Sequence, residues 1–199
     1  MRALLLFSLL ISGFSLSAQW QNLNSGTAAR LNAVQLVTDQ VFVAGGEGVF
    51  LRSENAGATW ANLPIVNAQN ISINGVEIND LHFFDAQTGI AVGSLIQNAQ
   101  LIMRTTDGGL HWTVVLNFSV PGGPEGGLLS LSFPDANTGY TCGTQGRIRK
   151  TTDGGLTWNA LANTGSYYTY NGIDFVTPDL GYVVGYGPQN DNVILKITN

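Results

Sequence analysis

The chain has 199 residues, of which 44% are hydrophobic and only 11% charged, and its formal net charge is −5. Nucleic acids and anionic membrane surfaces attract proteins with a basic patch, so this composition argues against both partners. One cysteine, Cys142, and two histidines are too few for a cysteine–histidine metal cluster, and no phosphate-binding glycine loop precedes a helix. We therefore expect no metal and no cofactor.

The N-terminus has the pattern of a secretory signal. Arg2 is followed by the apolar run "ALLLFSLLISGF" and then by the small, polar "SLSAQ". The apolar run is shorter than the roughly twenty residues that span a bilayer. We predict a signal peptide over residues 1–18, cleavage near Ala18 and an exported chain 19–199 that is periplasmic, cell-surface or secreted. No membrane insertion is expected once the signal is removed.

One pattern of about fifty residues then recurs along the chain. Its copies end in "SENAGATW" at Trp60, "TTDGGLHW" at Trp112 and "TTDGGLTW" at Trp158. Short runs of alternating apolar residues, bounded by Asp, Asn, Gly and Thr, precede each copy and predict four strands per repeat, here named A to D. A period of this length built from short strands indicates the blades of a β-propeller.

The repeats divide the chain into blades at about 29–63, 78–116, 128–162 and 170–199. In the second blade, strands are expected at 80–84, 90–93, 101–105 and 112–116. "WQNLNSG" from Trp20 matches "WNALANTG" from Trp158, so 20–26 is expected to be a lone D strand. The sequence thus predicts an all-β propeller of four-stranded antiparallel blades. It is either a four-blade ring closed by that D strand or part of a six- to eight-bladed ring, and the second is favoured slightly.

The repeated "TTDGGLTW" motif is expected to be scaffold rather than active chemistry. Its Asp can accept hydrogen bonds from backbone N–H groups ahead of it, its Gly supplies positive φ, and its Trp packs between sheets. The first copy has Asn55 in place of Asp and Ala56 in place of Gly. The residues given this structural role are Ser53, Asn55, Gly57, Trp60, Thr105, Asp107, Gly109, Trp112, Thr151, Asp153, Gly155 and Trp158.

This motif resembles the Asp-box, or bacterial neuraminidase repeat, and the resemblance covers nearly all of the mature chain. "FPDANTGYTCG", joined to "GRIRKTTDGGLTW", is similar to the photosystem II stability and assembly factor type of propeller, which also occurs among exported proteins. The resemblance implies a chaperone-like scaffold for another protein. It also leaves a glycoside hydrolase of the sialidase or xyloglucanase type as the alternative.

Binding residues are expected among the irregular B–C and D–A loops, which share one face because strand direction alternates. Loops on a rigid frame often carry function. The candidates for this binding face are Tyr167, Tyr168, Tyr170, Tyr186 and Phe118. Tyrosine at a loop surface suits contact with a protein, peptide or glycan. Ordinary packing is an equally weighted interpretation.

A second set occupies one equivalent position of the A strands: Gln35, His82, Ser132 and Asp174. If this position faces the central channel, it forms a polar ring that contains a histidine and a carboxylate. If it faces a neighbouring blade, each side chain is a hydrogen-bonded interface residue, and this interpretation is favoured.

An enzyme is not expected. The sialidase resemblance would imply three substrate-binding arginines, and the arginines outside motif positions and the signal are only Arg30, Arg147 and Arg149. Inverting glycosidases need two carboxyl groups roughly 6.5–9.5 Å apart, and no such pairing is visible in the sequence. We therefore predict a non-catalytic binding or assembly scaffold.

Overall fold

The computed structural model describes residues 20–95, 99–118, 126–161 and 167–198, and within them the chain forms fifteen strands in four antiparallel sheets. The predicted fold class is confirmed: each sheet is a propeller blade whose strands follow one another in chain order. Three blades have four strands and the last has three. Blade 1 contains β1 (Leu31–Leu36), β2 (Phe42–Gly46), β3 (Phe50–Ser53) and β4 (Ala61–Leu63).

The other blades have the same order. Blade 2 contains β5 (Glu77–Phe83), β6 (Gly89–Leu95), β7 (Ala99–Thr105) and β8 (Thr113–Phe118). Blade 3 contains β9 (Leu128–Ser132), β10 (Gly139–Gly143), β11 (Ile148–Thr151) and β12 (Asn159–Ala160). Blade 4 contains β13 (Thr169–Thr177), β14 (Leu180–Tyr186), one 3-10 turn (Pro188–Asn190) and β15 (Asn192–Thr198). No helix in the described ranges is long and apolar enough to cross a membrane.

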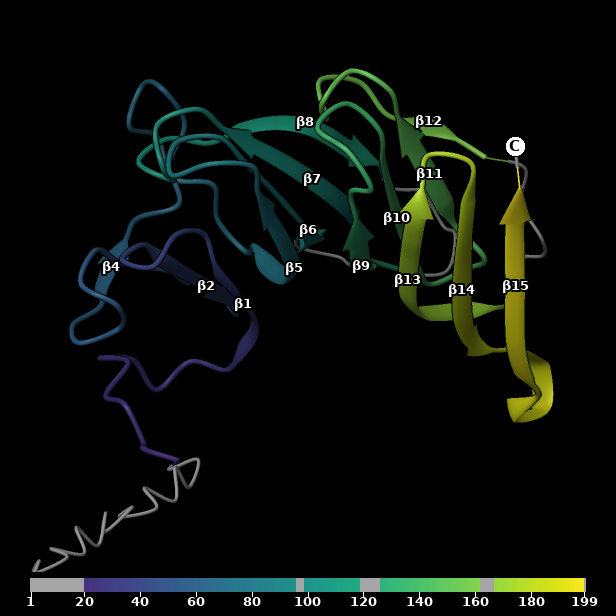
Figure 1. The fold of residues 1–199 in the computed structure, drawn as a ribbon, viewed down its shortest axis with the longest axis horizontal. Coiled ribbons are helices and arrows are strands. Elements are labelled where there is room, and N and C mark those ends of the chain that lie inside the picture. The colour runs from purple at the N-terminus through teal and green to yellow at the C-terminus, as the bar shows by residue number, and fades with distance from the viewer. Residues whose placement is uncertain (1–19, 96–98, 119–125, 162–166, 199) are drawn as a thin grey trace, which may run out of the picture.

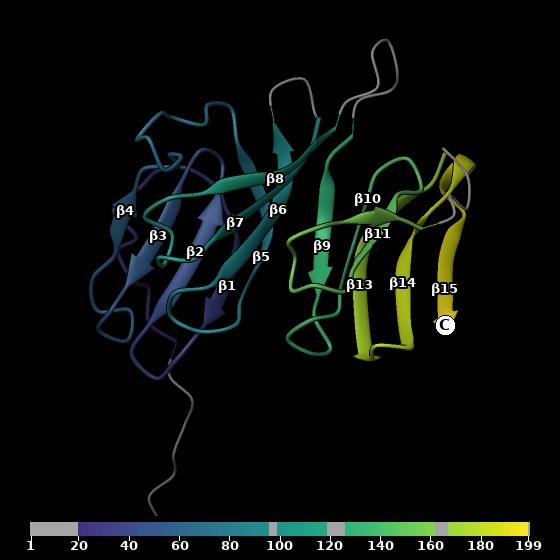
Figure 2. The ribbon, with the colours of Figure 1, turned by 90° about the horizontal axis from the view of Figure 1, so that it is seen from above.

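The blades stand side by side along an open arc, with blade 1 at one end and blade 4 at the other (Figures 1 and 2). The first strand of each blade contacts the first strand of the next, from β1 through β5 and β9 to β13. Residues 20–30 contain no strand, and Leu23 lies near Leu51 and Trp60 of blade 1. The structure therefore differs from the expectation that 20–26 completes the last blade, because this segment lies at the opposite end of the arc.

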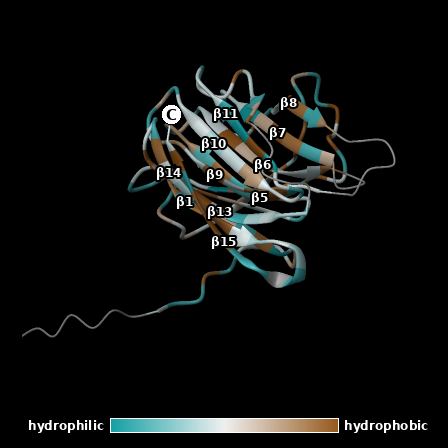
Figure 3. Cartoon of the chain, turned by 90° about the vertical axis from the view of Figure 1, so that its right-hand side faces the viewer, coloured by the Kyte–Doolittle hydropathy of each residue, from teal (hydrophilic) through white to brown (hydrophobic). Residues whose placement is uncertain are grey.

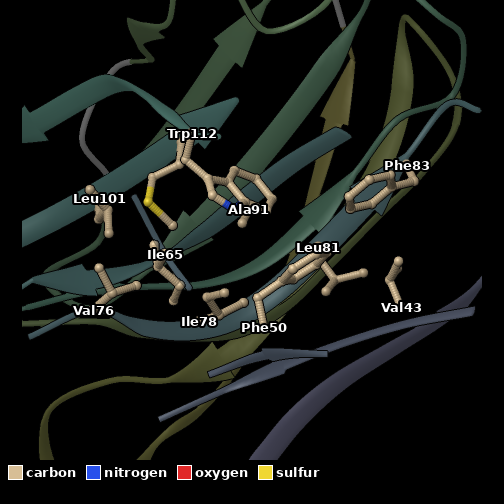
Figure 4. Close-up of a cluster of buried hydrophobic side chains, with 11 residues drawn as sticks. Val43, Phe50, Ile65, Val76, Ile78, Leu81, Phe83, Ala91, Leu101 and Trp112 are labelled. Atoms are coloured by element: carbon tan, nitrogen blue, oxygen red, sulfur yellow. The ribbon is translucent and has the colours of Figure 1, made fainter. Parts of the chain in front are cut away.

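Hydrophobic packing between neighbouring sheets joins the blades. Brown, hydrophobic stretches dominate β6 and β7 at the middle of the arc (Figure 3). Between blades 1 and 2, Trp112 lies edge-on to Phe50, with ring centroids 5.1 Å apart, inside a cluster that includes Phe83 and Ala91 (Figure 4). One buried aromatic side chain removes roughly 150–250 Å² from water, so this interface is held largely by apolar contact.

Every blade contains a bulge near the start of its first strand. In blade 2 the bulge residue is Asn79, and the neighbouring Glu77 carbonyl oxygen approaches Gly93 so closely that a Cβ there would lie 1.8 Å from it. A bulge bends and twists its strand, and only glycine leaves room for this close approach. The equivalent bulge residues of blades 1, 3 and 4 are Asn32, Leu129 and Asn171.

Candidate functional site

The turn between the third and fourth strand of a blade, here called the C–D turn, is a closed hydrogen-bond network. In blade 3, Thr151 Oγ1 accepts from the backbone N–H groups of Asp153 (3.3 Å) and Gly155 (3.0 Å) and donates to Asp153 Oδ1 (2.7 Å). The carboxylate of Asp153 accepts from both the N–H (2.9 Å) and the hydroxyl (2.6 Å) of Thr157. These bonds lower the pKa of Asp153 to about 2, the Thr157 hydroxyl contributing most.

Blade 1 makes the same network with an amide in place of the carboxylate. Asn55 Oδ1 accepts from the Thr59 N–H at 2.9 Å, while Asn55 Nδ2 donates to the Thr59 hydroxyl at 2.8 Å. Ser53 Oγ accepts from the N–H of Gly57 at 2.9 Å. In blade 2, Asp107 Oδ1 likewise accepts from the His111 N–H at 2.9 Å. The degenerate copy of the motif therefore retains the turn, and all three copies hold the backbone.

The tryptophan that follows each C–D turn has a different environment in each blade. Trp112 is 1% exposed and Trp158 is 8% exposed, whereas Trp60 at the end of the arc is only partly buried. Before the turns, Arg52 Nη1 donates to the carbonyl of Gly108 at 3.2 Å, and Arg104 Nε donates to that of Gly154 at 3.4 Å. Each arginine thus links its blade to the C–D turn of the next.

The acids of the turns between first and second strands also bind backbone. Asp85 accepts from the N–H groups of Gln87 and Thr88, both at 2.7 Å, and the first of these bonds contributes most to lowering the Asp85 pKa. Asp135 makes the same contacts in blade 3. In blade 1 this role falls to the hydroxyl of Thr38 rather than to Asp39.

The candidate channel residues lie along the seams between first strands. Gln35 bonds both the N–H (2.6 Å) and the carbonyl (3.0 Å) of Phe83 in the next blade, and Ser132 Oγ accepts from Phe175 N–H at 3.0 Å. Asp174 contacts Ser132 at 3.4 Å across the same seam. These contacts agree with the interpretation that this position of the first strand faces the neighbouring blade.

His82, the fourth member of that set, stacks on Phe133 of blade 3 with ring centroids 5.0 Å apart. Burial lowers its pKa, so the neutral imidazole is favoured in this aromatic seam. Asp80 lies at the same blade boundary, where its Oδ2 accepts from Leu131 N–H at 2.8 Å. Burial raises the pKa of Asp80, although the backbone bonds to Leu131 and Leu81 oppose this shift.

The candidate binding tyrosines do not form one surface. The prediction that Tyr170 lies on the binding face is wrong. Its side chain is 0% exposed and packs in the core between blades 3 and 4, because it points inward from β13. Tyr168 is half-buried, and Tyr167 is 79% exposed beside it. Tyr186 lies on the free outer side of β14 and is 42% exposed.

Phe118 marks a pocket of about 190 Å³ between blades 2 and 3, whose lining includes Arg147, Arg149 and Leu161. Both guanidinium groups approach the phenyl ring, Arg147 at 5.3 Å and Arg149 at 5.4 Å from its centroid. An aromatic face attracts cations, so Phe118 holds two like charges beside each other. The ring is 41% exposed.

Local backbone positions both arginines. A tight hairpin with positive φ at Gln145 (62°) and Gly146 (65°) joins β10 to β11. Arg147 directly precedes β11 and Arg149 lies within it, and both side chains reach the Phe118 ring. Arg149 is 8% exposed, and its Nε donates to Gln100 Oε1 of blade 2 at 2.8 Å. Arg147 donates from Nε (3.2 Å) and Nη2 (2.6 Å) to Gln145 Oε1.

The charge of this pocket is not balanced by a described carboxylate. Among the described residues, ion pairs form at Arg30–Glu77, Arg52–Glu54 and His111–Asp107, and none includes Arg147 or Arg149. Burial lowers the pKa of Arg149, and the charge of Arg147 adds to the shift. The sequence does not reveal that these two arginines meet at Phe118, because the position of Phe118 on a different blade is visible only in the fold. Glu125 lies outside the described residues.

Among the described residues, no three His, Cys, Asp or Glu side chains come close enough together to hold a metal ion. The three arginines compared with those of sialidases are also separated. Arg147 and Arg149 share the pocket, whereas Arg30 pairs with Glu77 at 2.6 Å at the boundary of blades 1 and 2. The geometry defines a small cationic and aromatic pocket suited to an anion.

Comparison with known proteins establishes the fold. No protein-family model matches the chain, and no curated protein matches it. Among solved structures, YCF48 from Cyanidioschyzon merolae is similar over 84% of this chain and 50% of its own, with 17% identity and a TM-score of 0.57. The GH74 xyloglucanase from Xanthomonas campestris is similar over 84% of this chain and 29% of its own, with 16% identity and a TM-score of 0.58.

A third similar structure is a computationally designed protein, Ika4, with 14% identity and a TM-score of 0.54 over 90% of this chain and 99% of that one. The chain therefore spans about half of the YCF48 chain, under a third of the GH74 chain and nearly all of the designed one. Identities this low show a shared fold alone. The chain is built of β-propeller blades.

Proposed function

We propose that this protein is an exported, non-catalytic scaffold that binds an acidic segment of another protein or peptide at the Phe118–Arg147–Arg149 pocket. The observation that carries the proposal is the pair of guanidinium groups, one buried and one half-buried, with no described carboxylate within ion-pairing distance. An anion there would satisfy their free N–H donors and reduce their mutual repulsion, and charge-assisted hydrogen bonds to carboxylates are among the stronger polar contacts. The partly exposed Phe118 side chain offers aromatic contact area for the remainder of a peptide.

The sequence pattern supports a scaffold role. The C–D turns resemble the Asp-box motif, and the acids of the turns in blades 2 and 3 are engaged in holding the backbone. The motif of blade 3 resembles the assembly-factor type of propeller, which implies recognition of a partner protein. The predicted signal peptide supports an activity outside the cytoplasm, and fractionation of cells expressing the full chain would test this.

Binding is tested with a fluorescent peptide that carries two acidic residues and a free C-terminal carboxylate. We expect binding that weakens with salt, because the half-buried Arg147 is accessible to solvent ions. Arg147→Gln and Arg149→Gln should each weaken it by roughly tenfold or more, the loss of one charge-assisted hydrogen bond. Arg30→Gln, which removes an arginine from a different blade boundary, is the matched control. Equal binding by all four proteins, or by an amidated peptide without acids, would contradict the proposal.

The alternative is a glycosidase of the sialidase or xyloglucanase type. Such an enzyme needs a general acid and a second carboxylate flanking the sugar bond. The acids Asp85, Asp107, Asp135 and Asp153 are engaged in turns, which supports the non-catalytic proposal. Release of a fluorophore from xyloglucan oligosaccharide or sialoside substrates by the purified protein would favour the alternative.

A further inference from the structure

The two ends of the arc carry the two halves of the interface that joins one blade to the next. The strand register identifies the equivalent positions. Arg104 lies opposite Ile90, Lys150 opposite Tyr140, and Lys196 opposite Tyr182. Val92 pairs with Ile102 in blade 2, and Val184 pairs with Ile194 in blade 4. Each position on the outer side of blade 4 therefore has a counterpart in blades 2 and 3.

We name the outer side of blade 4 the tail face, defined by Tyr182, Val184, Ile194, Lys196 and Asn171. Its blade 2 counterparts Ile90, Val92 and Ile102 are at most 1% exposed, because blade 3 covers them. On the tail face, Tyr182 is 44%, Val184 46% and Ile194 74% exposed. An apolar sheet face of this kind, ending in the unpaired edge strand β15, is a typical site of association.

The opposite half of the interface lies on blade 1. We name this the head face, defined by the exposed Val34 and Leu36 and the partly buried Trp60; Leu51 beneath them is 1% exposed. The register of blade 1 aligns Val34 with Ala44 and Ala44 with Leu51 across three strands. The same register in blade 2 aligns Leu81 with Ala91 and Ala91 with Met103. Leu81 is 6% and Phe83 3% exposed, but their counterparts Val34 and Leu36 are 65% and 67% exposed. The head face therefore has the apolar pattern with which an interior blade meets the blade before it.

Polar groups on the tail face also match those of interior interfaces. The bulge residues Asn32 and Asn79 donate from Nδ2 to the carbonyls of Ile78 (2.9 Å) and Leu128 (2.7 Å) in the next blade. Asn171 occupies the same bulge position in blade 4 and is exposed. Lys196 occupies the position equivalent to Arg52 and Arg104, which donate hydrogen bonds to the C–D turn of the next blade. A chain docking its head face here would offer the carbonyls of Leu31 and Ala56 at the equivalent places.

We propose that this protein binds a second copy of itself head to tail. The tail face of one copy packs on the head face of the other as each interior blade packs on the next. The contact is heterologous, so it must close or propagate. Two copies supply eight blades, which lies within the range of closed propellers, and closure uses both contacts.

The N-terminal segment fits this arrangement. Residues 20–26 have the pattern of a fourth strand, lie beside the head face and leave Trp20 97% exposed. Among the described residues blade 4 has three strands, and β15 is its free edge. In the two-copy ring, residues 20–26 of one copy can pair with β15 of the other, which would cover both that edge and Trp20. This inference is independent of the proposed peptide pocket, because it uses different faces of the molecule.

The first measurement is the mass of the chain without residues 1–18, by light scattering or sedimentation equilibrium across a wide concentration range. We expect a species of twice the chain mass. A monomer at the highest concentrations would overturn the proposal. A series of ever larger species would overturn the closed two-copy ring.

Two variants then test the orientation. Ile194→Asp disables the tail face and Val34→Asp disables the head face, and both positions are exposed, so each variant is expected to fold. Each variant alone should be monomeric, whereas an equimolar mixture should form a two-chain complex through its one intact pair of faces. Tail-to-tail contact would leave Val34→Asp dimeric, head-to-head contact would leave Ile194→Asp dimeric, and either result overturns the proposal. Leu156→Asp, at a 58% exposed position within the arc, is the control and should remain dimeric.

Thermal unfolding followed by circular dichroism separates loss of contact from loss of fold. Monomeric variants that keep the β-sheet spectrum and a cooperative transition support the proposal. If the two face variants unfold while Leu156→Asp does not, Asn171→Ala provides a milder test. We expect it to weaken dimerisation roughly fivefold or more, because the ring loses one hydrogen bond at each of its two contacts. No change in the dimer dissociation constant would count against the proposed contact.

Discussion

Trp158 donates a hydrogen bond from its indole nitrogen to the carbonyl of Gly155 at 3.3 Å, whereas the same nitrogen of Trp112 is buried with no partner among the described residues. The two residues occupy one position of the repeat. Comparing them therefore separates the contribution of the buried ring to stability from the contribution of its N–H group.

Replacing each tryptophan with phenylalanine should therefore have unequal effects. Trp158→Phe loses a hydrogen bond together with packing, while Trp112→Phe removes a donor whose desolvation was uncompensated. We expect Trp158→Phe to lower the free energy of unfolding by about 1 kcal/mol more than Trp112→Phe does. Urea denaturation of both variants measures this difference. The opposite order would mean that packing, rather than the N–H group, decides the outcome.

A second pair of variants concerns glycines in the left-handed region. A Cβ on Gly109 (φ +92°) would lie 2.1 Å from Phe50 Cε1, whereas a Cβ on Gly48 (φ +68°) would meet nothing within 4 Å. Gly48→Ala should therefore cost only the backbone term, about 1–2 kcal/mol. Gly109→Ala should cost several kcal/mol more, because it also displaces Phe50 from the interface between blades 1 and 2. Denaturation midpoints of the two variants, compared at equal slope, give the result.

Repetition made most of the architecture predictable. Three copies of one motif identified the blades, and alternation placed their strands within a few residues of the observed ones, as with β6 and β7. The degenerate first copy was harder to interpret. In blade 1, Thr38 performs the role that Asp85 and Asp135 have in blades 2 and 3, because its hydroxyl reaches the equivalent N–H groups.

The candidate site was less predictable, since it depends on contacts between blades. Tyr170 and Tyr167 are three residues apart in one aromatic stretch, yet the first is buried because it points inward from β13, and the second is exposed because it precedes that strand in a turn. Phe118 was expected to be a binding residue, but its guanidinium neighbours come from another blade. The repeat defines which residues are equivalent, and only the fold shows which equivalent positions lack a neighbouring blade.

Asp153 should make stability depend on pH. Its folded pKa of about 2 lies below the ordinary value of 3.8, so its contribution is fully present above 3.8 and is lost as pH falls through about 2. Asp153→Asn should keep the hydrogen bond to the backbone, as Asn55 does in blade 1. It should lose the part of the stabilisation that depends on the negative charge. We expect wild type to be more stable than this variant at neutral pH and the difference to shrink toward pH 2. A difference independent of pH would show that the carboxylate adds nothing over an amide.

Cys142 should report on the opening of the contact between blades 3 and 4. Its side chain is 0% exposed, and burial, with a smaller contribution from Asp80, raises the pKa of the thiol to about 12. The thiolate is the reactive form, so a disulfide reagent at mildly alkaline pH should modify the folded protein at least a thousandfold more slowly than the protein in concentrated guanidinium chloride. Val183→Ala removes a fully buried contact of the same core cluster and should accelerate labelling. Ile71→Ala, at an exposed loop position, should not. Rapid labelling of the native chain would mean that blade 4 separates readily from blade 3.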